Sequence, residues 1–293
     1  MSWSGGKDSA FALHTIIGEG IYDVRYLLST IDGNSRRLTI HEVQETLLEQ
    51  QAQLIGIPLK KCYLYNKDNK SYEAALHSTL TEMKEEGIHH IIFGDLFLED
   101  LRSYREEMMK AFGMVCVFPL WQMDSLNVVN DFVAKGFKSV ICSVNDTYLP
   151  GTWVGKLIDE SFLESLPAKI DPCGENGEYH SFCFDGPIFK HAIDFTHGKT
   201  FSKSFKLNQI CDDANSPSKL LLWYMEILPG PVTRQLTCAR CKQRFVCNSS
   251  DVENCQCNAV MLTREITTAL ENNYEDCLCS NCLQKLEQNN ARS

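Results

Sequence analysis

Apolar residues in the first part of the chain follow two alternating patterns. Four short continuous runs have the length and composition of buried parallel strands: Val24–Thr30, Leu59–Tyr65, Ile88–Phe93 and Met114–Phe118. Between these runs, apolar residues recur every three or four positions, which predicts helices over His41–Ile55, Ser71–Glu86 and Leu98–Phe112. Because strands and helices alternate, we expect an α/β fold in which helices cover both faces of a parallel sheet.

The second part of the chain continues with patterns of its own. A helix is predicted from Asp124 through Lys135, and a strand over Phe137–Val144. Gly151–Ser165 is expected to be helical in its second half. Asp171–Phe189 is predicted to form a hairpin, because Asn176-Gly177 is a strong signal for a two-residue hairpin turn.

Proline and glycine then mark a boundary between units. A last strand is predicted over Lys219–Leu228, and Pro229-Gly230-Pro231 has the composition of a linker. We therefore expect three units, at residues 1–121, 122–230 and 233–293.

A turn with two glycines opens the chain and leads into a helical pattern. It consists of the residues Ser4, Gly5, Gly6, Lys7, Asp8 and Ser9. A glycine turn at the start of a helix directs backbone N–H groups and the positive end of the helix dipole at one spot. Lys7 adds a charge, and the carboxylate of Asp8 is a ligand type for Mg²⁺. We interpret the turn as a phosphate site, and an ordinary polar turn between strand and helix is the alternative.

Two further positions are expected at the same edge of the sheet. Ligands of parallel α/β sheets bind outside the carboxyl ends of the strands. Ser29 lies near the end of one predicted strand, and Gly94-Asp95 follows another, so all of them are candidates for a shared nucleotide site. A tight turn with a helix cap is the alternative explanation for Gly94-Asp95.

The first predicted strand is short. Only Met1, Ser2 and Trp3 precede the glycine turn, whereas a strand usually has about five or six residues. We expect the native strand to begin upstream of Met1, and added upstream residues to raise the thermal midpoint.

Composition and charge exclude several classes of protein. Hydrophobic residues make up 44% and charged residues 23% of the 293 residues, as in soluble globular proteins. The sequence contains neither a membrane-length apolar run nor a secretory signal pattern, so we expect a cytoplasmic protein. Residues 1–232 carry the whole net charge of −10 and residues 233–293 are neutral, which argues against a nucleic-acid partner.

Cysteine is concentrated at the end of the chain. Eight of the 14 cysteines form a dense group: Cys238, Cys241, Cys247, Cys255, Cys257, Cys277, Cys279 and Cys282. In a cytosolic chain such a group predicts metal ligation rather than disulfides, and two four-thiolate Zn²⁺ sites would use all eight. An Fe–S cluster and unliganded buried thiols are the alternatives.

Several segments together resemble one family. They are Ser4–Ser9, Gly94–Arg102 with Arg105 and Glu106, Trp153–Glu160, Gly174–Phe182 and Asp185–Phe189. In this order they are similar to the diphthine–ammonia ligase family of ATP pyrophosphatases, over about residues 1–228. The resemblance implies a Rossmann-like nucleotide domain of the HUP type, followed by a smaller α/β substrate domain.

The resemblance also implies a reaction. A substrate carboxylate attacks the α-phosphorus of ATP, which expels pyrophosphate and leaves an acyl-adenylate. Ammonia then displaces AMP and forms an amide. The implied cofactors are ATP and Mg²⁺, the implied partners are ammonia and a carboxylate acceptor, and a homodimer is left open.

The candidate residues follow from the turn, the sheet edge and the resemblance. For ATP they are Ser4, Gly5, Gly6, Lys7, Asp8, Ser9, Ser29, Gly94 and Asp95. For the substrate they are Arg102, Arg105, Glu175, Glu178 and His180, and the catalytic candidates are Lys7, Asp8, Glu175 and Glu178. By residue type alone, solvated turn carboxylates are the favoured explanation for Glu175 and Glu178, and the family resemblance reverses this preference. For Arg102 and Arg105, a helix-surface ion pair explains the residues nearly as well as anion binding does. His14, His41 and His77 are interpreted as surface or packing residues.

The tail resembles a small bacterial cysteine-rich domain named CWC, with Gln256 where that family has Trp. A small core around a helix near Thr263–Leu270 is expected there. Because bacterial translation factors are not expected to carry diphthine, this resemblance points to another carboxylate as the acceptor.

Three hypotheses about function therefore stand beside one another. The first is an AMP-forming amide ligase, and the second is an RNA-modifying enzyme of the same superfamily. The third is an ATP- and zinc-binding adaptor without catalytic activity.

Overall fold

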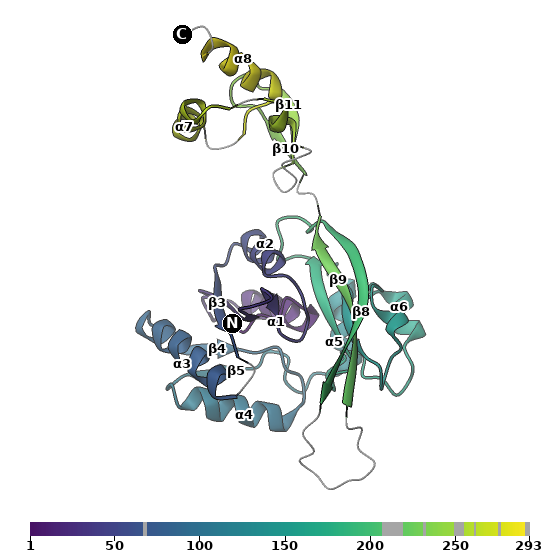
Figure 1. Cartoon of the computed structure of the whole chain (residues 1–293). Helices are drawn as coiled ribbons and strands as arrows, with labels where there is room; N and C mark the ends of the chain where they lie inside the picture. The colour runs from purple at the N-terminus through teal and green to yellow at the C-terminus, as the bar shows by residue number, and fades with distance from the viewer. Residues whose placement is uncertain are drawn as a thin grey trace. The chain divides into compact units, whose positions relative to one another are not determined.

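The computed structural model describes residues 1–66, 69–206, 219–230, 233–248, 255–260, 262–274 and 277–290. The chain divides into two compact units, Met1–Leu228 and Pro229–Ser293, which we call the body and the tail. Figure 1 shows that each unit has helices and strands of its own. Among the described helices, none combines the length and the apolar character needed to cross a bilayer.

A parallel sheet organises the first half of the body, as predicted. Strand β1 (Leu27–Asp32) pairs in parallel with β3 (Leu59–Leu64), and β4 (His90–Ile92) pairs in parallel with β5 (Val115–Val117). The first three residues join these two pairs, because Ser2 N donates to Ile92 O (2.8 Å) and Trp3 N donates to Leu28 O (2.8 Å). The order is therefore β3, β1, residues 1–3, β4 and β5. The short β2 (Arg37–Leu38) pairs antiparallel with the end of β1.

Four helices alternate with these strands, close to the predicted ranges. They are α1 (Lys7–Glu19), α2 (Glu45–Ile55), α3 (Asn69–Glu85) and α4 (Glu99–Lys110). Glycines with positive φ end α1 and α2, at Gly20 (65°) and Gly56 (84°), because a residue without Cβ adopts the left-handed cap easily. Helix α2 begins at Glu45, four residues after the predicted start, which leaves His41 in the preceding loop.

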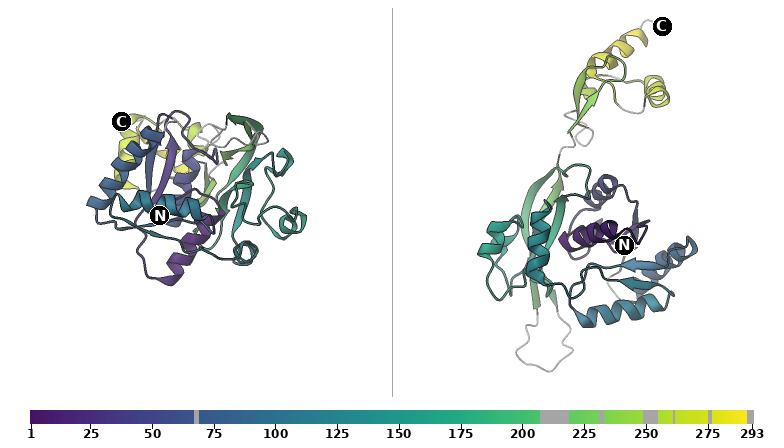
Figure 2. Two further views of the ribbon diagram at one scale, coloured as in Figure 1. Left: turned by 90° about the horizontal axis from the view of Figure 1, so that it is seen from below. Right: turned by 180° about the vertical axis from the view of Figure 1, so that it is seen from behind.

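A second, antiparallel sheet builds the rest of the body. Its order is β7-β6-β9-β8, formed by β6 (Lys138–Asn145), β7 (Tyr179–Asp185), β8 (Phe195–Lys206) and β9 (Lys219–Pro229). Figures 1 and 2 show β8 and β9 side by side, with α6 (Glu160–Ser165) on the side of this sheet away from α1. The α5 helix (Ser125–Ala134) is capped by Asp124, whose side chain accepts from Asn127 N. The predicted strands over Phe137–Val144 and Lys219–Leu228 are confirmed.

The predicted hairpin over Asp171–Phe189 is wrong. Only β7 in this range is a strand, and it pairs antiparallel with β6 rather than with a strand at Asp171. The Asn176-Gly177 turn exists, with Gly177 N donating to Gly174 O (3.0 Å), but residues 171–178 form a loop. Side chains rather than strand pairing hold this loop, so a turn signal alone predicted the wrong structure around it.

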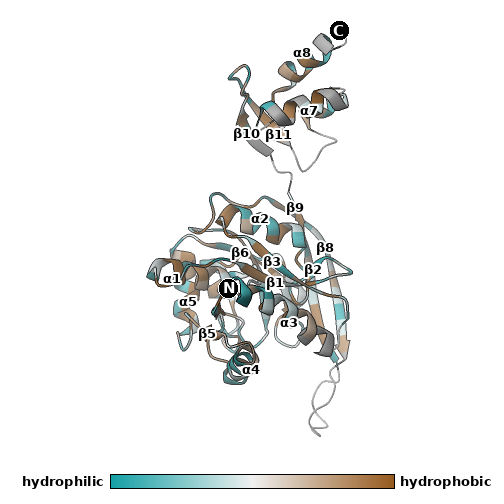
Figure 3. Cartoon of the chain, turned by 90° about the vertical axis from the view of Figure 1, so that its left-hand side faces the viewer, coloured by the Kyte–Doolittle hydropathy of each residue, from teal (hydrophilic) through white to brown (hydrophobic). Residues whose placement is uncertain are grey.

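One apolar core runs through both sheets of the body. Trp3, Leu13 and Leu47 from the first half belong to the same buried cluster as Phe132 and Phe182 from the second. Each such side chain contributes about 1.5–3 kcal/mol on burial. Figure 3 shows the apolar colour on central strands and more polar colour on the outer helix α4. The predicted boundary near residue 121 therefore lies inside the body.

Within its described residues, the tail contains a short hairpin and two α-helices. Strands β10 (Thr233–Thr237) and β11 (Arg244–Asn248) pair antiparallel, and the short η3 (Gln256–Ala259) follows. Helix α7 (Arg264–Asn273), capped by Thr263, confirms the predicted helix, whereas α8 (Ser280–Asn290) was not predicted. Its small core contains Cys238, Val260, Leu278, Cys279, Cys282 and Leu283.

Candidate functional site

The body contains a cavity of about 540 Å³ at the start of α1. Its wall combines segments that are far apart in the sequence: the glycine turn, the ends of β1 and β4, the loop before α2, and the segment from Cys173 to Ser181. The predicted residues that line it are Ser4, Gly6, Lys7, Asp8, Ser9, Gly94, Asp95, Arg105, Glu175 and His180. The fold therefore gathers the start of the chain and the loop before β7 around one space.

The two glycines of the turn are required by close packing. Gly5 has a φ of +70°, and a Cβ there would lie 2.7 Å from Gln51 Oε1 and 2.8 Å from Leu48 Cδ2. A Cβ on Gly6 would lie 2.9 Å from the carbonyl oxygen of Ser181. Any larger residue would push the turn away from α2 and β7, which form the wall behind it.

Hydroxyl groups surround the backbone of the turn. Gly6 N donates to Ser4 Oγ (3.3 Å), and Ser4 Oγ donates to Ser9 Oγ (3.2 Å). Lys7 N donates to Ser181 Oγ (3.1 Å). Because α1 starts here, the positive end of its dipole adds to these donors. In this structure the N–H groups of Gly6 and Lys7 donate to hydroxyl oxygens, and a phosphate site at the turn stays a prediction.

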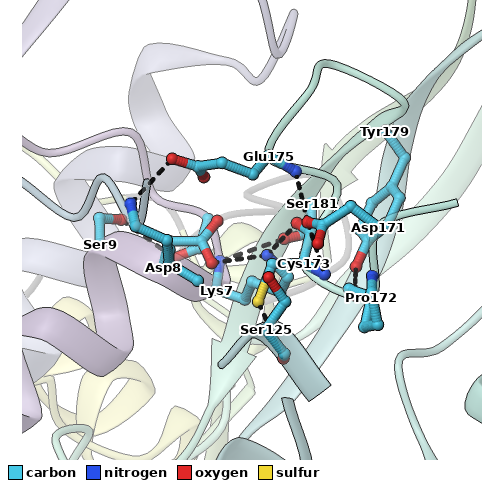
Figure 4. Close-up of polar contacts among 12 residues, drawn as sticks. Lys7, Asp8, Ser9, Ser125, Asp171, Pro172, Cys173, Glu175, Tyr179 and Ser181 are labelled. Atoms are coloured by element: carbon cyan, nitrogen blue, oxygen red, sulfur yellow. Dashed lines mark hydrogen bonds and ion pairs between the residues drawn. The ribbon is translucent and has the colours of Figure 1, made fainter. Parts of the chain in front are cut away.

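Lys7 connects the turn with the loop before β7 (Figure 4). Its Nζ is 2.6 Å from Asp8 Oδ1 and also donates to the carbonyl oxygen of Cys173. The side chain is only 3% exposed. Burial opposes the charge of Lys7, but Asp8 beside it holds the lysine pKa above its ordinary value. The charged side chain of Lys7 therefore links the glycine turn to the loop before β7 on the opposite side of the cavity.

Two carboxylates shape the loop of residues 171–178. Asp171 Oδ2 accepts from Cys173 N (3.1 Å) and Glu175 N (2.9 Å). Glu178 Oε1 accepts from Asp171 N (3.1 Å) and from the Asn176 amide (3.1 Å). These bonds replace strand pairing and fix the direction in which Cys173 and Glu175 face.

Glu175 and Glu178 have different surroundings, although they flank the same turn. Glu175 lines the cavity, and its Oε1 accepts from Leu96 N (2.8 Å). Burial, together with Asp8 and Asp95 nearby, raises the pKa of Glu175 to about 7. Glu178 is 2% exposed, and the described residues that line the cavity do not include it. The cavity thus has one glutamate that changes charge near neutral pH.

The tail gathers its thiols into two groups. The sulfur atoms of Cys238, Cys241, Cys279 and Cys282 all lie within 4.8 Å of one another, and the Cys241–Cys279 distance is 3.5 Å. Cys247 contacts Cys255 and Cys277, and Cys257 contacts Cys255. Sulfur atoms of a tetrahedral zinc site are about 3.8 Å apart, given a Zn–S bond of about 2.3 Å. The first group therefore has the spacing of a four-thiolate metal site.

Comparisons with known proteins agree with this organisation. Residues 1–116 match the diphthamide synthase N-terminal domain, and residues 124–212 match the diphthamide synthase C-terminal domain. Residues 238–284 match the family described as cysteine-rich CWC. The chain belongs to the diphthine–ammonia ligase family. The resemblance noted in the sequence is thereby confirmed.

Curated relatives in this family are distant. The diphthine–ammonia ligase of Schizosaccharomyces pombe is 28% identical over 66% of this chain, which spans 35% of that protein. The mouse diphthine–ammonia ligase is 25% identical over 65% of this chain and 79% of its own length. The zebrafish protein of the same name is 24% identical over 73% of this chain and 89% of its own length. The chain thus spans about a third of the yeast relative and most of the vertebrate ones.

Not every candidate residue of this family member reaches the cavity. Ser29 Oγ donates to Trp3 O (2.6 Å) and is buried, while its neighbour Thr30 lines the wall. Arg105 lines the cavity, with its Nε 2.7 Å from Asp95 Oδ2. Arg102 pairs with Glu106 (2.8 Å) one helical turn away, and the described cavity wall does not include it.

The contributors to the cavity of this family member that sequence reasoning missed include His41, Ser181 and the carbonyl group of Cys173. Strand alternation places Ser181 on the face opposite to His180 and so gave no signal for it, but Ser181 lies within the Gly174–Phe182 segment that carries the family resemblance. His41 was interpreted as a packing residue, because the helix predicted from His41 onward gave it no special place.

Proposed function

We propose that this chain is an ATP-dependent C–N ligase that activates a carboxylate as an acyl-adenylate and amidates it with ammonia. The observation that carries the proposal is the single cavity in which the glycine turn faces the loop before β7, joined by Lys7. The names of the relatives, diphthine–ammonia ligases, support the same chemistry.

In this proposal ATP binds along the glycine turn and the sheet edge. The phosphates are held at Ser4–Ser9, and Gly94 and Asp95 complete the nucleotide site beside Ser29. The strand order β3-β1-(1–3)-β4-β5 supports a Rossmann-like nucleotide domain over residues 1–121, followed by a substrate domain over 122–230. Gly94 must approach α1 closely, because a Cβ there would lie 3.0 Å from Asp8 O.

Asp8 is the proposed ligand for Mg²⁺. Its carboxylate lies in the first turn of α1, is 31% exposed, and is ion-paired with Lys7. A magnesium ion here supplies charge neutralisation for the phosphates. Lys7 then exchanges part of its contact with Asp8 for the departing pyrophosphate, which keeps the buried ammonium group paired.

The reaction proceeds in two balanced steps. A carboxylate oxygen of the acceptor bonds to the α-phosphorus of ATP while the bond to the β-phosphate oxygen breaks and pyrophosphate leaves. The ammonia nitrogen then bonds to the carbonyl carbon of the acyl-adenylate, and AMP leaves with the electrons of the broken C–O bond. The ammonia nitrogen also releases a proton.

The remaining candidates hold the second substrate and the acceptor. We assign ammonium binding to Glu175, because it is the cavity glutamate that becomes charged near neutral pH. Glu178 sets the loop that carries Glu175, and Arg105 and His180 line the acceptor side. Arg102 is paired with Glu106 and lies outside the described cavity wall, so we assign it no contact with the acceptor.

In the tail, over residues 233–293, we propose two structural Zn²⁺ sites. One uses Cys238, Cys241, Cys279 and Cys282, and the other uses Cys247, Cys255, Cys257 and Cys277. Gln256 joins the two cysteine segments, since its amide donates to Leu278 O (3.1 Å) and accepts from Ser280 N (2.8 Å). Two zinc ions would give this small unit the stability that its few apolar residues lack.

The test measures ATP–pyrophosphate exchange with a diphthine peptide, and then with a panel of metabolite carboxylates. We expect exchange with one of them, release of AMP and pyrophosphate, and a gain of one amide by mass spectrometry when ammonium is added. Asp8→Ala should lower exchange at least about 10³-fold, because a charge-stabilising group is lost. The exposed Asp23→Ala is the matched control, with 82% of its side chain exposed. Release of ADP and orthophosphate would overturn the proposal.

A further inference from the structure

His41 lies in the cavity wall against the glycine turn, between β2 and α2. Its Cε1 would be 3.2 Å from a Cβ on Gly6, so the ring lies directly beside the proposed phosphate cradle. On its other side the ring lies 4.7 Å from the ring of His180, measured between centroids. These contacts leave the imidazole little freedom to turn.

One hydrogen bond decides which ring nitrogen carries the proton. His41 Nδ1 is 3.2 Å from the carbonyl oxygen of Ser181. A carbonyl oxygen only accepts hydrogen bonds, so Nδ1 must be the N–H donor. In the neutral ring Nε2 then has an available lone pair and is a proton acceptor.

The surroundings keep this ring neutral before the reaction. Burial lowers the pKa of His41 to about 4, and Lys7 opposes a second positive charge there. His180 lies half-buried beside it, and desolvation likewise lowers the pKa of His180 well below its ordinary value. Three acidic groups line the described cavity wall: Asp8 is paired with Lys7, Glu175 accepts from Leu96 N, and Asp95 is paired with Arg105.

We propose that His41 is a catalytic base of the amidation step, and this inference rests on the proposed function. As the ammonia nitrogen bonds to the acyl-adenylate, one N–H bond breaks and its proton moves to Nε2 of His41. The imidazolium that forms lies beside the turn, where the AMP phosphate is about to leave. Its charge therefore appears at the moment when the leaving group becomes more negative.

The experiment uses His41→Asn in the full chain. Asparagine keeps an N–H donor for Ser181 O at the place of Nδ1 but has no counterpart of Nε2. His77→Asn is the matched control, since His77 is exposed on α3 and contacts Phe112 outside this cavity. His41→Gln is the second variant, to be used if His41→Asn does not fold.

Three rates separate the possibilities, all measured with the carboxylate that supports pyrophosphate exchange in the wild-type protein. Exchange of pyrophosphate into ATP should stay within about threefold of wild type, because the first step needs no base. The kcat of amide formation from ammonium should fall about 10²–10⁴-fold, with little change in the KM for ammonium. Hydroxylamine, whose nitrogen is far less basic than ammonia, should show a much smaller loss.

Other outcomes overturn the assignment. An amidation kcat close to wild type would show that His41 accepts no proton. Equal losses in exchange and amidation would assign His41 to nucleotide binding or structure instead. If wild-type protein exchanges pyrophosphate with no carboxylate, the proposed function fails and the base role of His41 fails with it.

Discussion

The body and the tail use the same residue, cysteine, in opposite ways. In the body Cys142, Cys173 and Cys183 are buried among apolar side chains, and burial raises the pKa of Cys183 to about 12. In the tail the thiols lie against one another, as at the 3.5 Å contact of Cys241 with Cys279. A thiol surrounded by hydrocarbon behaves as a small apolar group, whereas several thiols together form a soft-metal site.

The difference follows from how much core each unit has. The body buries residues such as Trp3, Leu47 and Phe132 in one continuous cluster. The tail has Val260, Leu278 and Leu283, and the other buried members of its core cluster are cysteines. A unit of this size rarely folds on so little apolar surface without metal or disulfides. From this difference we expect the tail, but not the body, to need metal for folding.

Removing metal should have the largest effect, and only on the tail. A strong chelator should release two zinc ions per chain and unfold residues 233–293, because a structural zinc contributes about 10–16 kcal/mol to folding. Limited proteolysis followed by mass spectrometry checks this, with the body as the internal control. Proteolytic cleavage throughout the body after chelation would contradict the expectation that only the tail needs metal.

A matched pair of cysteine variants tests whether the thiols of the tail bind zinc while those of the body do not. Cys279→Ala removes a ligand of the first thiol group and should lower the zinc content from two ions to one per chain. Cys142→Ala, at a position that is 0% exposed in the body, should leave zinc unchanged and cost about 1 kcal/mol of unfolding free energy. Elemental analysis and denaturant unfolding measure both. Equal zinc loss in the two variants would contradict different roles for the two sets of thiols.

A cavity in the apolar core should affect the body alone. Leu47 is 0% exposed on α2, and Leu47→Ala should lower the unfolding free energy of the body by about 2–5 kcal/mol. The control is Leu126→Ala on α5, where the side chain is 48% exposed and the expected change is small. The zinc content should be the same in both variants. A change in zinc binding with Leu47→Ala would show that the two units are coupled.

The smallest expected effect concerns Glu175, a carboxyl group of the cavity whose pKa is raised by burial. Because burial raises the pKa of Glu175 to about 7, the carboxylate that binds ammonium in our proposal forms as the pH rises through 7. The KM for ammonium should therefore fall several-fold over this range in wild type and stay flat in Glu175→Gln. The same raised pKa means that the folded state holds a proton that the unfolded state releases near pH 4.5. Relative to Glu175→Gln, wild-type stability should thus decrease between about pH 4.5 and 7.

Local patterns in the sequence were enough to predict much of this protein. Helices α1 to α4 and the parallel strands between them follow largely from the spacing of apolar residues, and from a glycine stop such as Gly56. The family followed from the combination of motifs, and the cysteine group from its density. All of these signals lie within a few residues of one another, so neighbouring side chains and backbone preferences determine them.

Only the tertiary structure decided how side chains divide between roles. Glu175 faces the cavity because its carboxylate accepts from Leu96 N. Glu178 faces the loop because its carboxylate accepts from Asp171 N. Ser29 Oγ donates to the carbonyl oxygen of Trp3, and His41 Nδ1 contacts the carbonyl oxygen of Ser181, more than a hundred residues away in sequence. Such choices depend on which distant backbone groups need a partner once the core has closed, and periodicity along a single chain contains no record of them.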